Sequence, residues 1–340
     1  MTATFHSERN YSLDVIKIIS CALVVLMHSL RAFDKSVEFH PFLYYLTRCS
    51  MPLFFLAAGA VQLQKACINF QYCYRKIKNI VLLMTAYYGC DFFLRIVTSC
   101  DFSFATLLST AKQCYWDFGV FWFLYTMIII YMVLPGLHKW YKKHPYSLLC
   151  IFGIFIITLN LYNIVNIQLN GAGQFVETTV LQPLRLWTWI FYYLIGGGVI
   201  FKSYKLIRLS KKLQWTTAII TTLCAIYYMH WMFFVTTNII NGEYAYTSLT
   251  MMLWSTSLMI AFLNTNFCKY KIAINRMAIM LIPVYALHYT VIHRIVLPLD
   301  IFFGYWGQIA GYATILFITS IFAYVITKFS FMKLFYKIQK

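Results

Sequence analysis

Apolar residues occur along this chain in blocks about twenty residues long, separated by short polar segments. A helix of about twenty residues crosses the hydrocarbon core of a bilayer, so each block predicts a membrane span. Strands of a membrane barrel are shorter and alternate in polarity, which these blocks do not. The predicted spans are 12–32, 42–63, 77–98, 118–138, 146–166, 185–204, 214–236, 244–264, 274–297 and 308–328. The pattern therefore predicts an all-α, polytopic transmembrane helix bundle with about ten spans.

Proline and glycine residues add detail to four of these spans. Pro52, Pro135 and Pro283 interrupt the second, fourth and ninth spans. Bundle helices tolerate proline because neighbouring helices satisfy the freed backbone groups. The triple glycine 196–198 in the sixth span predicts a close approach between two helices. A phosphate-binding loop is the weaker interpretation of these glycines, because no strand precedes them.

The composition excludes a soluble globular protein. The 340 residues are 61% hydrophobic and only 11% charged, whereas soluble domains carry about 25% charged residues. The longest connections between spans, about 99–117 and 167–184, are too short to fold alone. Residues 1–340 are therefore predicted to form a single integral-membrane domain.

The formal net charge of +18 would suggest a nucleic-acid partner in a soluble protein, but topology explains it here. With the N-terminus inside, 21 of the 28 Lys and Arg residues fall in inside segments. The seven outside residues are Arg31, Lys35, Arg48, Arg95, Lys112, Arg185 and Arg294. Inside loops of membrane proteins carry such an excess of basic residues. We therefore expect both termini to be cytoplasmic and no nucleic-acid partner.

The first span carries three ionisable residues, Asp14, Lys17 and His28. Such residues are costly inside a membrane and indicate a functional site. Lys17 and His28 are eleven residues apart, so both lie on one helical face, about 16 Å apart along the axis. Asp14 precedes Lys17 by three residues, a spacing that permits an ion pair. We expect this face to point into the bundle, although His28 alone also fits a histidine hydrogen-bonded to a neighbouring helix.

The ninth span carries a second histidine, His288, at a depth comparable to that of His28. Two histidines at matching depth on inward-facing helices are placed to share a substrate site. Neither has a metal-binding H-E-x-x-H pattern around it. We expect no metal ion.

Three basic residues, Arg75, Lys76 and Lys78, precede the third span. Such a group is an ordinary topology signal, and we interpret Lys76 in that way. Arg75 and Lys78 share a helical face and are candidates for holding a phosphorylated ligand at the membrane surface. Arg supplies bidentate contacts to phosphate, and Lys supplies a point charge.

Taken in order, these motifs resemble the membrane acyltransferase-3 family of bacterial ten-span O-acyltransferases, in the form without an attached extracytoplasmic domain. The matching segments are Lys17 to His28, Met51-Pro52-Leu53-Phe54-Phe55 before Ala58-Gly59, Arg75-x-x-Lys78, Phe121-Trp122-Phe123-Leu124-Tyr125 and Tyr285-Ala286-Leu287-His288. The resemblance extends from residue 9 to about 330. The departures are Lys for Arg at positions 17 and 78, and Ala58 where serine is common.

The resemblance implies transfer of an acyl group, usually acetyl, to a hydroxyl of a cell-envelope polysaccharide or glycolipid in the inner (plasma) membrane of a bacterium. Cytoplasmic acetyl-CoA or another acyl-CoA would be the donor substrate, with no bound cofactor. An imidazole suits proton removal at neutral pH, so His28 is the predicted general base or, alternatively, the transient acyl carrier. Lys17 is expected to be a catalytic residue together with His28. The resemblance also implies Asp14 and His288 for acceptor positioning and Arg75 and Lys78 for donor binding. Trp122 and Tyr125 are expected to line the pocket.

Two other classes of membrane protein are alternatives to the O-acyltransferase. A transporter that exports a glycan or carries a small anion predicts inverted repeats with broken helices, and the sequence shows neither. A glycan polymerase or ligase usually carries a large extracytoplasmic loop, and the longest loop here is about 18 residues. We therefore favour the O-acyltransferase, whose partners are acyl-CoA, the glycan or lipid-linked sugar acceptor, and the lipid bilayer.

Overall fold

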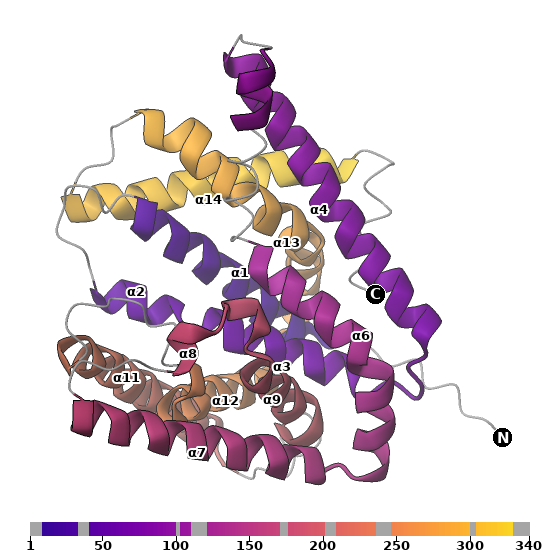
Figure 1. The fold of residues 1–340 in the computed structure, drawn as a ribbon, viewed down its shortest axis with the longest axis vertical. Helices are drawn as coiled ribbons and strands as arrows, with labels where there is room; N and C mark the ends of the chain where they lie inside the picture. The colour runs from indigo at the N-terminus through magenta and orange to yellow at the C-terminus, as the bar shows by residue number, and fades with distance from the viewer. Residues whose placement is uncertain are drawn as a thin grey trace.

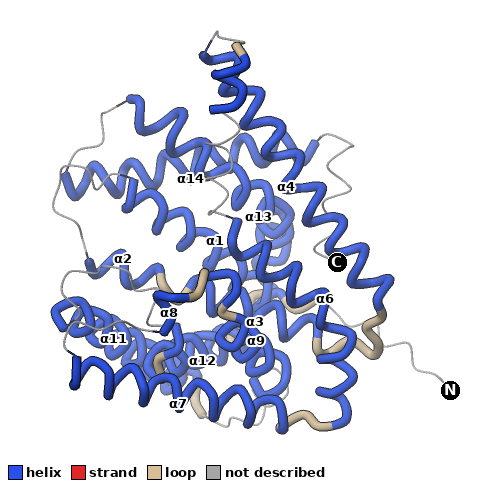
Figure 2. Tube along the Cα trace, in the orientation of Figure 1, coloured by secondary structure: helices blue, strands red, loops and turns tan. Residues whose placement is uncertain are grey.

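The computed structural model describes residues 9–32, 41–99, 103–109, 121–170, 176–200, 209–235, 246–299 and 304–328. Every regular element in these ranges is a helix, as Figure 2 shows. The longer helices are α1 (Tyr11–Ala32), α3 (Ser50–Gln62), α4 (Phe70–Ser99), α6 (Trp122–Lys143), α7 (Ser147–Asn170), α9 (Leu186–Leu194), α11 (Lys211–Val235), α12 (Leu249–Leu263), α13 (Lys271–Val291) and α14 (Gly304–Lys328). The short helices include α2 (Pro41–Thr47) and α8 (Val176–Thr179). The prediction of an all-α fold is confirmed.

Each predicted span overlaps a helix, or a pair of helices, in the structure. Five of these helical segments in the described part of the chain are long and apolar enough to cross a membrane: α1, α6, α7, residues 268–299 around α13, and α14. A bundle of such helices is a membrane protein. The number of ten crossings and the cytoplasmic termini stay predictions.

The second predicted span is divided, but not at its proline. Helix α2 ends at Thr47 and α3 begins at Ser50, so the break falls before Pro52. Pro52 lies in the first turn of α3, where a missing N–H costs nothing because it would have no partner within the helix. Pro135 and Pro283 lie inside continuous helices. Proline therefore interrupts none of these three helices.

Helix α1 lies at the centre of the fold. It packs against α13, α14, α3, α2 and α12, and Figure 1 shows α1 between α13 and α14 on one side and α3 on the other. Helices α7, α9, α11 and α12 form the lower part of the same view. Because α1 is covered on several sides, the polar residues along it face other helices.

The triple glycine allows close contact between two backbones, as predicted. Helix α9 continues into a π-helical segment, Ile195–Ile200, that lies against α3. A Cβ atom on Gly196 would overlap the carbonyl oxygen of Leu56, and one on Gly197 would overlap that of Gly59. Gly59 itself lies against the carbonyl oxygen of Tyr193. Only glycine leaves room for such an approach.

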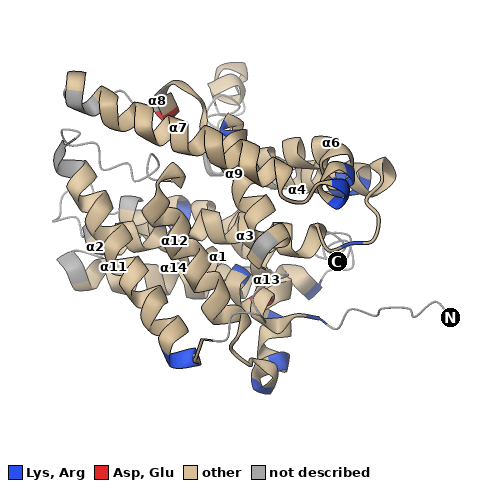
Figure 3. Ribbon diagram, turned by 90° about the horizontal axis from the view of Figure 1, so that it is seen from below, with Lys and Arg blue, Asp and Glu red and all other residues tan. Residues whose placement is uncertain are grey.

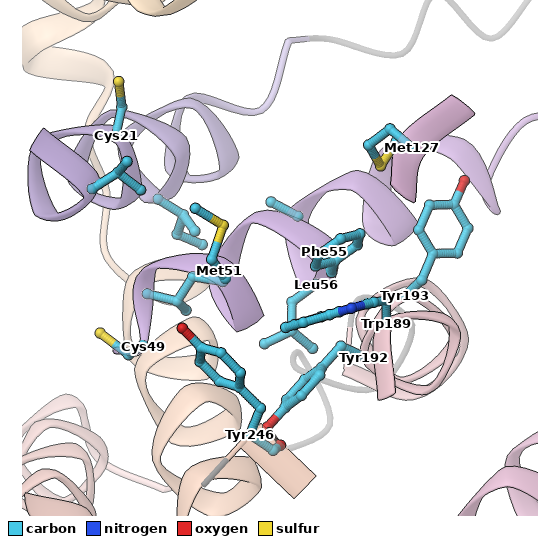
Figure 4. Packing of buried hydrophobic residues seen from close by; sticks show 14 of the residues in the cluster. Cys21, Cys49, Met51, Phe55, Leu56, Met127, Trp189, Tyr192, Tyr193 and Tyr246 are labelled. Carbon is cyan, nitrogen blue, oxygen red and sulfur yellow. Dashed lines mark hydrogen bonds between the residues drawn. The ribbon is translucent and has the colours of Figure 1, made fainter. Parts of the chain in front are cut away.

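Large aromatic side chains fill the space beside these glycine contacts. Phe55 of α3 stacks on Trp189 of α9 with 4.8 Å between ring centroids, and both rings are visible in Figure 4. The hydroxyl of Tyr192 donates a hydrogen bond of 2.8 Å to the carbonyl oxygen of Tyr246. Stacked rings contribute about 0.5–1.5 kcal/mol beyond their burial. Helices α3 and α9 therefore form one tightly packed unit.

Basic residues gather at particular helix ends. Figure 3 shows Lys and Arg concentrated in the lower and right-hand parts of the view, around the end of α6 and the starts of α11 and α13. These residues include Lys142 and Lys143 at the end of α6 and Lys211 and Lys212 at the start of α11. All four belong to segments for which the charge pattern predicts an inside location.

Candidate active site

The two histidines that the sequence indicates lie next to each other in the structure, with their ring planes tilted by 44°. His28 projects from α1 and His288 from α13, and their ring centroids are 5.1 Å apart. The two helices pack along their length, which places residues of equal depth opposite each other. His288 is fully buried, whereas His28 is half-buried. The expected pairing of the two histidines is present.

The backbone of α13 determines the hydrogen bonding of His288. Its Nδ1 lies 2.7 Å from the carbonyl oxygen of Tyr285, one turn earlier. A carbonyl can only accept, so we assign the proton to Nδ1. The other ring nitrogen, Nε2, is buried without a hydrogen-bond partner among the described residues. That nitrogen carries a lone pair and can accept a hydrogen bond from a hydroxyl group.

Aromatic rings from α6 and its preceding residue cover Tyr285. Phe121 and Phe123 lie 6.0 and 6.1 Å from the Tyr285 ring, measured between centroids. Trp122 instead packs against Trp189, at 5.0 Å. The predicted lining residue Trp122 thus belongs to the α6–α9 contact, while its two neighbours lie beside the turn that carries His288.

Tyr125, the other predicted lining residue, is part of α6 and packs against the hydrophobic core.

A second set of rings extends from the histidine pair towards the end of α13. The His28 ring meets Tyr289 edge-on at 6.2 Å, and Tyr289 lies 4.2 Å from His293. His293 is exposed and belongs to a π-helical segment, Ile292–Val296, that follows α13. Polar rings therefore connect the histidine pair with the surface.

Lys17 lies in a different environment from His28, at the start of α1. Its Nζ is 3.9 Å from Asp14 Oδ1, a long distance for an ion pair. The closer partner of Asp14 is Arg9, whose Nε lies 2.5 Å from Oδ2. Asp14 and Lys17 thus lie near each other, as expected. Asp14 is fourteen residues, or about 21 Å along the axis, from His28, so the structure does not bring it to the histidine pair.

Helix α4 begins at Phe70, seven residues before the predicted span, so all three basic residues of this region are helical. Arg75 and Lys78 are exposed, whereas Lys76 is only 5% exposed. The helical turn places Lys76 on the inner face and the other two on the outer face. Lys76, which the sequence pattern indicated as a topology signal, is buried.

Sequence reasoning missed a buried arginine beside the site. Arg48, counted from the sequence as a charge on the outside, is 1% exposed at the junction of α2 and α3. Its Nη1 lies 3.2 Å from the sulfur of Met27, the residue before His28, and its guanidinium lies 4.1 Å from the Tyr44 ring centroid. Its position inside predicted span 42–63 was the signal that could have found it.

The fold and the site together define a helical membrane protein whose interior holds facing ionisable side chains. A family model described as an acyltransferase domain matches residues 10–328, nearly the whole chain. The chain belongs to this family, acyltransferase-3, and the protein is a membrane transferase that acts on acyl groups. Comparison with curated proteins and with solved structures gave no match.

Proposed function

We propose that this protein is an O-acyltransferase that moves an acyl group, most simply acetyl, from cytoplasmic acyl-CoA to a hydroxyl of a cell-envelope polysaccharide or glycolipid. The proposal places it in the inner membrane of a bacterium with both termini cytoplasmic. The observation that supports it best is the pair formed by His28 and His288, 5.1 Å apart between two packed helices of an acyltransferase-family chain.

The site offers the groups that acyl transfer to a hydroxyl requires. A base removes the hydroxyl proton while the oxygen attacks the thioester carbonyl, and the carbon–sulfur bond then breaks to release the thiol. In this proposal His28 takes that proton and returns it to the leaving sulfur. In the covalent variant, the His28 ring first takes the acyl group and then passes it to the hydroxyl. His288 Nε2 accepts a hydrogen bond from the acceptor in either case.

The chemical test is the acyl content of the envelope glycan. Mass spectrometry of the glycan from cells with and without the protein should show base-labile acyl groups only when the protein is present. Loss of glycan export in place of loss of acyl groups would instead support a carrier. Shortened glycan chains would support a polymerase.

Topology gives an independent prediction. In a variant lacking native cysteines, a cysteine introduced for Thr179 should react with an impermeant maleimide added outside intact cells. A cysteine introduced for Lys212 should react only after the membrane is permeabilised. Both positions are exposed in the structure, so access depends on the side of the membrane. The reverse labelling pattern would contradict the predicted orientation, because the donor-binding residues would then face away from cytoplasmic acyl-CoA.

The exposed basic pair on α4 is expected to assist donor binding. Arg75→Ala and Lys78→Ala should each raise the KM for acyl-CoA about tenfold, because each loses a charge-assisted contact to phosphate. The KM for the acceptor should stay unchanged. Steady-state kinetics with each substrate varied in turn checks this. An unchanged donor KM in both variants would leave the pair as a topology signal only.

A further inference from the structure

Three lysines converge at the inner face of α4. Lys65, in the turn between α3 and α4, donates a hydrogen bond of 2.7 Å to the hydroxyl of Tyr72, and its Nζ lies 4.0 Å from the centre of that ring. Lys76 approaches the same ring at 5.6 Å. Lys76 is also within electrostatic range of Lys65 and of Lys17 on α1. We call Lys17, Lys65 and Lys76 the lysine cluster.

The surrounding elements hold this cluster in place. His138 of α6 contacts the carbonyl oxygen of Lys65 through Nε2, at 3.0 Å. The Tyr72 hydroxyl donates to Gln62 Oε1 at 2.7 Å, and the amide of Gln62 donates to the Tyr131 hydroxyl at 3.2 Å. Four segments thus meet here: the end of α3, the turn after it, α4 and α6. Such positioning is typical of a binding site, in contrast to solvated surface lysines.

A buried hydroxyl without a partner lies beside the same network. Tyr193 of α9 is fully buried, and its hydroxyl has no hydrogen-bond partner among the described residues. Its hydroxyl is within electrostatic range of Tyr72, Cys73 and Tyr131. Buried hydroxyls normally have a hydrogen-bond partner, so this hydroxyl is available to a further group. A hydroxyl can donate to an anion.

Burial and mutual repulsion act on the charges of the cluster. Asp14 contacts Lys17 on α1, and Arg9 contacts Asp14 more closely than Lys17 does. Burial lowers the pKa of Lys65, in the turn. Burial, with repulsion from Lys65 and Lys17, lowers the pKa of Lys76, which precedes the predicted span, to about 8. A bound anion would offset both effects.

We infer that the lysine cluster, together with the Tyr193 hydroxyl, is a binding site for the diphosphate group of a coenzyme A thioester. This inference rests on the proposed function and adds donor-binding residues to it. Lys76 and Lys65 would contact the phosphates, and Lys17 would close the site from α1. The exposed Arg75 and Lys78 then face the outer part of the same ligand.

The order of groups in coenzyme A indicates that the lysine cluster binds the diphosphate and not the 3′-phosphate. Starting from the thioester, the pantetheine arm comes first, then the diphosphate, and the ribose with its 3′-phosphate last. Lys17 lies about 16 Å from His28 along α1, a span that the extended pantetheine arm covers. With the thioester at His28, the first negative group met is therefore the diphosphate. The 3′-phosphate falls farther out, towards Arg75 and Lys78.

The test measures binding, so it does not depend on catalysis. Lys65→Met and Lys76→Met remove the charge and keep the apolar stem, and Lys212→Met on the exposed start of α11 is the matched control. Calorimetry on the purified full-length protein would use coenzyme A and 3′-dephospho-coenzyme A, with inorganic pyrophosphate as competitor. Both cluster variants should bind either coenzyme about ten- to a hundredfold more weakly, and Lys212→Met should bind as the wild type does.

Pyrophosphate should displace coenzyme A from the wild type and should do so far less well from residual complexes of the cluster variants. Lys65→Arg, which keeps the charge, should restore affinity and shows that a loss in Lys65→Met is not misfolding. Unchanged coenzyme affinity in Lys65→Met and Lys76→Met would overturn the inference, as would a loss seen with coenzyme A but not with the 3′-dephospho form. Lysine-dependent binding without acyl transfer would refute the proposed function alone. Acyl transfer with an unaltered donor KM in both cluster variants would refute the inference alone.

Discussion

His28→Ala is expected to reduce acyl transfer below detection while the protein still inserts and accumulates normally. Loss of a general base costs about 10²–10⁴ in rate, and loss of a covalent acyl carrier would cost at least as much. The half-buried ring of His28 leaves little unfilled volume when it is truncated, so stability should change little. The measurement is the acyl content of the glycan, normalised to the amount of protein in the membrane.

His288→Ala is the matched comparison on the facing helix. Its Nδ1 is engaged with the Tyr285 carbonyl oxygen, so only Nε2 remains for the substrate. A positioning contact contributes less than a base, and we expect reduced acylation with a measurable remainder. Wild-type acylation in His28→Ala would remove the catalytic assignment and favour a transporter. Complete loss of acylation in His288→Ala, with substantial acylation in His28→Ala, would make His288 the base and His28 the positioning residue.

The second large effect concerns stability. Gly59→Ala and Gly196→Ala should each lower the free energy of unfolding by about 3 kcal/mol, the upper end of the usual cost of overpacking. The added methyl group meets a backbone carbonyl in each case, that of Tyr193 or that of Leu56. A backbone cannot rotate away as a side chain can. Thermal unfolding of the purified protein in detergent should show a clearly lower Tm, together with reduced accumulation in cells.

Gly136→Ala, inside α6, is the control for this prediction. Nothing lies within 4 Å of the position that its Cβ would occupy. Alanine favours a helix over glycine by about 1 kcal/mol, so this variant should be unchanged or slightly more stable. Equal Tm values for Gly59→Ala and Gly136→Ala would contradict the close backbone contact between α3 and α9.

The sequence was most informative where one physical constraint dominates. Membrane thickness sets helix length, and all ten apolar blocks overlap helices in the structure. Helix ends were less predictable because polar turns can extend a helix beyond the apolar segment, as Phe70–Lys76 does at the start of α4. The break between α2 and α3 was misplaced at Pro52, because a proline in the first turn of a helix looks in sequence like one in its interior.

The residues of the candidate site were also predictable where one physical constraint dominates. The spacing of Lys17 and His28 and the matching depth of His288 could be deduced from helix geometry alone. Which face of a helix is buried depends on its neighbours, which the sequence does not name. Lys76 was therefore interpreted as a topology signal and Arg48 was counted as an outside charge, although both are buried. For the same reason Trp122 was chosen as lining, whereas its neighbours Phe121 and Phe123 contact Tyr285.

The backbone around His288 has a consequence for movement during turnover. Pro283 lies five residues before it, inside α13, and the π-helical segment Ile292–Val296 begins four residues after it. Both features weaken the regular hydrogen-bond ladder of a helix. The helical turn between them is thus a short segment with a weakened hydrogen-bond ladder at each end, in a helix that packs against α1 and α14. Small displacements that admit an acceptor and release an acylated product would be concentrated in this segment of α13, and the rest of the bundle would stay still.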